Sequence, residues 1–171
     1  MSLSMYDASM PAITQTLQAL SGILDKAQAH AEARKIDPAV LLATRLIPDM
    51  FPLSRQIQIA CDFAKGTMAR LAGVEVPSYA DNETTIPEMK ARIEKTLAFI
   101  GSLDKAAVEA SADRDITFKA GNREMHFKGK PYLVGFALPN FYFHVSMAYA
   151  ILRASGVELG KSDFMGMKLP A

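Results

Sequence analysis

An amide and an imidazole, four residues apart in an apolar stretch, are the side chains of this sequence best suited to chemistry. They are Asn140 and His144, at the end of the run LPNFYFH at positions 138–144. Residues four apart share one face of a helix, and apolar residues recur on that face at helical spacing. We therefore predict a core-facing stripe with both polar groups in its middle, made of Leu133, Phe136, Asn140, His144, Met147, Ala148 and Ile151.

A buried amide and a buried imidazole need polar partners, because an unpaired polar group inside a protein costs about 1–3 kcal/mol. Three kinds of partner are consistent with the sequence. The first is a hydrogen-bonded network with a purely structural role. The second is a metal ion that takes a nitrogen of His144 as a ligand, and the third is a small molecule in a pocket without metal.

The other reactive residue types are interpreted as structural. The single cysteine, Cys61, cannot form an internal disulfide, and its place at the edge of an apolar helical stripe predicts a small core residue. His30 and His126 have charged neighbours and are predicted to lie on the surface. Asp62, opposite an apolar stripe, and Arg92, which alternates with glutamates, are both predicted to be solvated.

Composition indicates one globular domain that spans residues 1–171. Nineteen basic residues oppose 18 acidic ones, so a net charge of +1 leaves no excess to neutralise the phosphates of a nucleic acid. No apolar run approaches the roughly 18 residues of a membrane helix, and the first residues lack the pattern of a secretory signal. We therefore expect a cytoplasmic protein without nucleic-acid or membrane partners.

Helical periodicity predicts four long helices, which span about residues 10–30, 53–72, 86–103 and 131–155. Ser9 is the expected N-cap of the first helix, and Gly73 is expected to end the second in a left-handed conformation. Asp37 begins a short additional helix through residue 42. Thr85 and Glu88 have the spacing of a capping box at the start of the third long helix.

Residues 116–127 change to a period of two on both sides of Gly121 and Asn122, which is typical of a β-hairpin. An isolated hairpin is marginal in water, so we expect it to pack on the helices or on a second copy of the chain. Pro139 is expected to kink the last helix. The tail, residues 157–171, is predicted to be irregular.

Four segments resemble an uncharacterised bacterial family of proteins of unknown function. They are RLIPDMFPL at 45–53, ARLAGV at 69–74, LPNFYFH at 138–144 and GKSDFMG at 160–166. That family is similar to the DinB-like and YfiT-like metalloenzymes. The resemblance implies a four-helix bundle with a long connection between the second and third helices, commonly assembled as a dimer. Some relatives are thiol-dependent transferases or isomerases.

The resemblance also implies where a metal site would lie. The superfamily uses one histidine on the second helix and a His-x-x-x-His pair on the fourth. His144 matches the second member of that pair, Asn140 stands at the first, and Gln56 or Gln58 stands at the second-helix position, with Gln56 closer to the apolar stripe. One imidazole and two neutral amides make a poor cage for zinc or nickel, so we expect a degenerate metal site without a tightly bound cofactor.

The sequence thus predicts an all-α, up-and-down four-helix bundle of the DinB-like type, with a β-hairpin inserted before the last helix. The leading functional hypothesis is a small polar ligand bound in the bundle interior near His144. One alternative is a metal-dependent transferase or hydrolase, in which His144 is a ligand and Asn140 with Gln56 or Gln58 holds a metal-bound water. The other is a structural homodimer whose partner face carries exposed Tyr142 and Tyr149.

Overall fold

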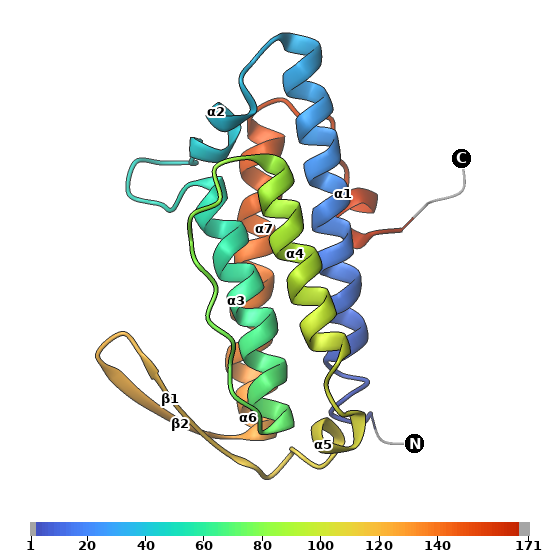
Figure 1. The fold of residues 1–171 in the computed structure, drawn as a ribbon, viewed down its shortest axis with the longest axis vertical. Helices are drawn as coiled ribbons and strands as arrows, with labels where there is room; N and C mark the ends of the chain where they lie inside the picture. The colour runs from blue at the N-terminus through green and yellow to red at the C-terminus, as the bar shows by residue number, and fades with distance from the viewer. Residues whose placement is uncertain (1–2, 168–171) are drawn as a thin grey trace.

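Four long helices make up most of this computed structural model, which describes residues 3–167 (Figure 1). The elements in chain order are α1 (Met10–Arg34), α2 (Pro38–Ala43), α3 (Leu53–Ala72), α4 (Ile86–Gly101), α5 (Lys105–Glu109), β1 (Asp115–Ala120), β2 (Arg123–Lys128), α6 (Gly129–Tyr132), the π-helical segment η1 (Leu133–Ala137), α7 (Leu138–Ala154) and α8 (Lys161–Met165). The chain is therefore mostly helical with one small hairpin before the last long helix, as predicted.

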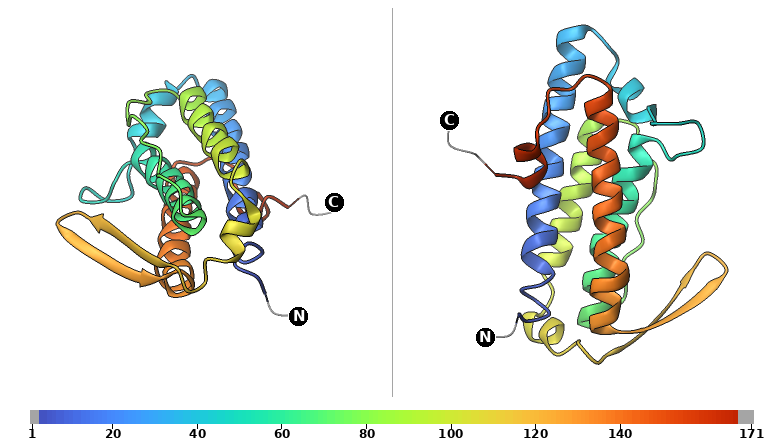
Figure 2. Two further views of the ribbon diagram at one scale, coloured as in Figure 1. Left: turned by 60° about the horizontal axis from the view of Figure 1, so that its bottom comes forward. Right: turned by 180° about the vertical axis from the view of Figure 1, so that it is seen from behind.

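The long helices lie side by side, and α1 and α3 both pack against α4 and α7 (Figures 1 and 2). Their directions differ from the alternating pattern that we expected, because α3 and α4 run the same way and α1 and α7 run the other way (Figure 1). The connection at residues 74–85 makes this possible. Extended, it reaches about 40 Å, enough to return along the roughly 30 Å of α3.

Most predicted helix ends are confirmed by their hydrogen bonds. The Asp37 carboxylate accepts from the backbone N–H of Ala39, Thr85 and Glu88 form a reciprocal capping box, and Gly73 ends α3 with φ +74°. Ser9 does not cap α1, because its hydroxyl donates to the carbonyl of Met5 at 2.7 Å instead.

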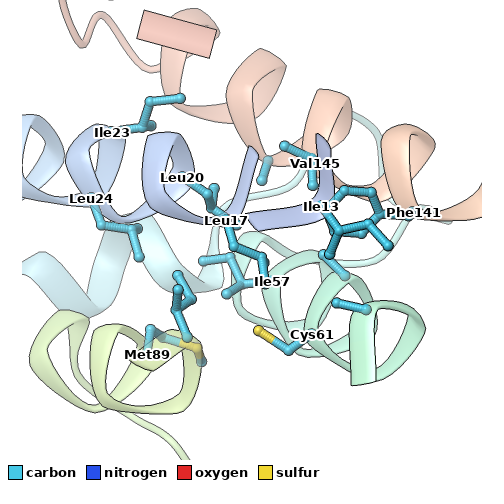
Figure 3. Packing of buried hydrophobic residues seen from close by; sticks show 14 of the residues in the cluster. Ile13, Leu17, Leu20, Ile23, Leu24, Ile57, Cys61, Met89, Phe141 and Val145 are labelled. Carbon is cyan, nitrogen blue, oxygen red and sulfur yellow. The ribbon is translucent and has the colours of Figure 1, made fainter. Parts of the chain in front are cut away.

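One apolar core runs between the four long helices. Leu17 of α1, Ile57 of α3, Met89 of α4 and Val145 of α7 all point into it (Figure 3). Cys61 is fully buried there, as predicted, and burial raises the pKa of its thiol to about 12. A thiol with so high a pKa stays protonated at neutral pH and is inert as a nucleophile.

The predicted hairpin is present, with Ala120 paired to Arg123 around a two-residue turn in which Gly121 has φ +57°. It projects from one end of the helices (Figures 1 and 2). Aromatic contacts hold it against the helices, since the ring of Phe118 lies 5.6 Å from that of Tyr132. The hairpin thus packs on the helical part of its own chain.

The tail is not irregular throughout, because residues 161–165 form α8, which packs against α1. The Asp163 carboxylate accepts from the backbone N–H of Gly160 at 2.8 Å and pairs with Lys26 at 2.6 Å. Phe164 of α8 packs edge-on against Tyr149 at 5.8 Å. The last predicted tail residues, 168–171, lie outside the described part of the chain.

Tyr142 and Tyr149 are consequently half-buried and do not form the open aromatic face that we expected. The predicted homodimer stays a prediction, without this face to support it. Within residues 3–167, no helix is both long and apolar enough to cross a membrane.

Candidate functional site

The orientation of α7 differs from the prediction by part of a turn. Its buried residues are Phe141, Val145, Ala148, Ile151 and Leu152. Asn140 and His144 are only partly buried and lie at the edge of this face rather than in its middle. The reason is η1, whose wider turns change the rotation per residue between Leu133 and α7.

Pro139 explains why the π-helical segment is there. A proline has no N–H to donate, and its ring clashes with the carbonyl four residues earlier in a regular α-helix. The chain meets this proline at the start of α7, directly after η1, so the helix is interrupted where the sequence predicted a kink.

His144 forms a hydrogen bond across to α3, where its Nδ1 lies 2.8 Å from Oε1 of Gln56. The Gln56 side chain is 1% exposed, and its Nε2 donates to the carbonyl of Phe51 at 3.2 Å. Because that donation orients the amide, Oε1 faces the imidazole, and Nδ1 must carry the ring proton. Within residues 3–167, Nε2 of His144 has no hydrogen-bond partner, so its lone pair is available.

The imidazole is held neutral. Burial, and then the positive charge of Arg55, lower the pKa of His144 below its ordinary value of 6.5. Two phenylalanines fix the ring: Phe63 stacks on it with centroids 5.9 Å apart, and Phe143 meets it edge-on at 5.2 Å. At neutral pH the group is therefore a positioned hydrogen-bond acceptor and base.

The two other predicted site residues have different partners. Asn140 donates from Nδ2 to the backbone carbonyl of Phe136 at 2.7 Å, so its amide is engaged with its own helix. Gln58 is buried but accepts from Arg55 at 3.2 Å and donates to Glu83 at 3.0 Å. Of the two glutamines, it is Gln56 that the fold brings to His144.

A polar cluster around Arg92 was missed by the sequence analysis, which predicted that residue to be solvated. The Arg92 side chain is 2% exposed and pairs with Asp62 at 2.9 Å, Asp81 at 2.9 Å and Glu83 at 2.8 Å. It also donates to the carbonyl of Ala80 at 3.0 Å. Arg92 is buried because the connection at residues 74–85 folds over α4.

Neighbouring arginines shift the pKa of one carboxylate of this cluster. Burial alone would raise the pKa of Asp81, but the hydrogen bond from Arg55 and the charges of Arg55 and Arg92 outweigh it, so this pKa is lowered. Asp62, predicted to be solvated, is only partly so, because it pairs with Lys65 at 3.0 Å as well as with Arg92.

A divalent metal does not fit the donors at His144. Within residues 3–167, no three His, Cys, Asp or Glu side chains come together as a metal-binding group. His144 offers Nε2, whereas Oε1 of Gln56 accepts the Nδ1 proton, and Asn140, whose Nδ2 donates to a backbone carbonyl, can add only a neutral amide oxygen. Tight zinc and nickel sites need several imidazole, thiolate or carboxylate donors, and this site provides one.

Comparison with solved structures places the chain in the DinB class. A DinB family member protein from Shewanella denitrificans is 39% identical to it and superimposes with a TM-score of 0.87 over 97% of this chain and 94% of that one. No curated protein matches the chain.

The family itself follows from the sequence match. The chain belongs to the family described as the domain of unknown function DUF1993, whose model matches residues 5–165. The resemblance to an uncharacterised DinB-like family is thereby confirmed, and the family description assigns no activity.

Proposed function

We propose that this protein binds a small polar ligand at His144, through a hydrogen bond from the ligand to Nε2 of the neutral imidazole. In this proposal residues 1–171 form a single four-helix-bundle domain of the DinB type. The observation that carries the proposal is the bond between His144 and the buried, fixed amide of Gln56, which selects the tautomer with a free Nε2.

The chemistry of Nε2 defines the kind of group that the ligand presents. A neutral imidazole nitrogen with a lone pair accepts a hydrogen bond from a hydroxyl, an amide N–H or an ammonium group. Phe143, which is 51% exposed, and Phe63 flank the imidazole, so the rest of the ligand meets apolar ring surface. We expect a ligand with one donor group and a small apolar body.

A metal-dependent transferase or hydrolase is the weaker alternative. It would need two more ligands beside His144, but Oε1 of Gln56 already accepts the Nδ1 proton of His144, and Asn140 can add only a neutral amide oxygen, a weak donor for zinc or nickel. The bond between Gln56 and His144 favours the ligand-binding role, because it positions the imidazole without using its Nε2.

Thermal unfolding with a panel of small amides, alcohols and amines tests the proposal. A compound that binds the native protein raises the melting temperature. We expect at least one compound to stabilise the wild type and His126→Gln, a control that removes an exposed imidazole, but to have no effect on His144→Gln. Equal stabilisation of all three proteins, or of none by any compound, would overturn the proposal.

A further inference from the structure

A hollow lies where the hairpin meets α3 and η1, with a volume of about 230 Å³. Its lining residues come from three elements and are Asp62, Phe63, Arg70, Phe118, Lys119, Ala120 and Phe136. Sites for drug-sized ligands have about 300–1,000 Å³, so this hollow suits a smaller molecule.

Three aromatic rings form the apolar part of the hollow, one each from α3, β1 and η1. The Phe136 centroid lies 6.0 Å from that of Phe63 and 5.6 Å from that of Phe118, and both pairs are tilted. Rings at these separations and angles offer both faces and edges to a further ring, which stacks or meets them edge-on. The apolar part therefore suits a flat aromatic group.

The polar part of the hollow consists of two cations, Arg70 and Lys119, and one ion-paired carboxylate, Asp62. The Arg70 guanidinium lies 4.4 Å above the Phe118 ring, and its Nη1 donates to the hydroxyl of Tyr132 at 3.1 Å. These contacts hold the Arg70 guanidinium in place. Within residues 3–167 this guanidinium forms no ion pair with a carboxylate. Lys119 is exposed on β1 beside it.

The single acidic residue of the lining does not cancel this positive charge. Asp62 is paired with Arg92 at 2.9 Å and with Lys65 at 3.0 Å, and neither of these cations lines the hollow. The lining charges that are not in an ion pair within residues 3–167 are therefore those of Arg70 and Lys119. A planar carboxylate is the anion that a guanidinium recognises best, through parallel N–H···O bonds.

We infer that this hollow binds a small aromatic carboxylate, with its ring against Phe118, Phe136 and Phe63 and its carboxylate on Arg70. The inference goes beyond the proposed function, because neither His144 nor Gln56 lines the hollow. Phe63 is shared, since the ring that lines the hollow also stacks on His144. A ligand here would lie next to the imidazole without replacing its polar ligand.

Calorimetric titration of the full chain with benzoate tests the inference, with benzyl alcohol and acetate as probes that keep only the ring or only the charge. We expect benzoate to bind the wild type at least tenfold more tightly than either probe. Arg70→Gln should weaken benzoate binding at least tenfold. Arg123→Gln, which removes an exposed hairpin arginine outside the hollow, should leave it unchanged.

A second variant is needed because Arg70 also bonds Tyr132, so Arg70→Gln could weaken binding through a folding defect. Phe63→Leu keeps an apolar side chain at the site and should still weaken benzoate binding, while its circular dichroism stays that of the wild type. Benzoate binding that is insensitive to both Arg70→Gln and Phe63→Leu would overturn the inference. Benzoate binding that is lost only in His144→Gln would overturn it too.

Discussion

At His144, two neighbours decide what the imidazole can do. Gln56 fixes which ring nitrogen carries the proton, and Phe63 covers one face of the ring. Burial then keeps the ring neutral. The same three features are the usual requirements for a histidine that acts as an acceptor or base, and none of them depends on a metal.

The lowered pKa of His144 predicts a pH dependence of stability. Because the folded-state pKa lies below 6.5, the unfolded chain binds this proton more readily, so the free energy of unfolding falls as pH drops below about 6.5. Above that range both states are neutral and the residue contributes no slope. In His144→Gln this slope between about pH 7 and 5 should be absent.

Urea unfolding at several pH values measures this slope, and the NMR titration of the His144 ring protons measures the pKa directly. His126→Gln removes an exposed imidazole instead and leaves the His144 contribution in place. A titration midpoint at or above 6.5, or identical pH profiles for the wild type and His144→Gln, would contradict the prediction.

At the scale of the elements, a buried arginine binds the connection at residues 74–85 to α4. Arg92 of α4 donates to the carbonyl of Ala80 and pairs with Asp81 and Glu83, all on that connection. Arg55 of α3 also pairs with Asp81. These ion pairs hold the connection against α3 and α4. Because the two helices run in the same direction, the connection has to run back from the end of α3 to the start of α4.

Replacing Arg92 should therefore destabilise the protein. Breaking a fully buried ion pair costs about 3–5 kcal/mol, but Asp62 and Asp81 are each 37% exposed and stay partly hydrated. We expect Arg92→Met to lower the free energy of unfolding by about 1–3 kcal/mol, measured by urea titration. Arg123→Met, at an exposed hairpin position, should change it by less than about 0.5 kcal/mol.

Equal stabilities of Arg92→Met and Arg123→Met would show that the connection is held by its other contacts. The amide exchange of residues 74–85 offers a local measure of the same effect. Loss of Arg92 should speed exchange there more than in α1, because Arg92 bonds the connection and not α1.

Local signals in the sequence predicted most elements, whereas interactions between distant segments were hidden from it. The range of α3 was predicted from its apolar periodicity and from Gly73 after it, and this correct placement is why Gln56 was preferred as the inward glutamine. The burial of Arg92 depends on a connection that returns over α4, and periodicity within one helix does not report that.

The phase of α7 was wrong for a similar reason. A helical wheel assumes one rotation per residue, and η1 changes it just before Pro139, so Asn140 and His144 were placed too centrally. α8 was missed because five residues are too few for a periodic pattern to emerge.

For the molecule as a whole, metal binding should be recoverable by restoring imidazoles at the positions that the fold brings together. Gln56→His with Asn140→His would give three histidines on α3 and α7, the set that the DinB-like resemblance implies. At pH 7.5 these imidazoles are largely neutral and available to zinc. We expect the double variant to bind about one equivalent of zinc and to melt at a higher temperature with zinc than with a chelator. A free zinc concentration of 100 times the Kd stabilises the native state by about 2.7 kcal/mol.

The matched control is Gln58→His with Asn140→His, because Gln58 bonds Arg55 and Glu83 rather than His144. If that control gains zinc equally, or if the wild type already binds one equivalent as tightly, then the pairing of Gln56 with His144 is not what separates this chain from a metal-binding DinB-like protein.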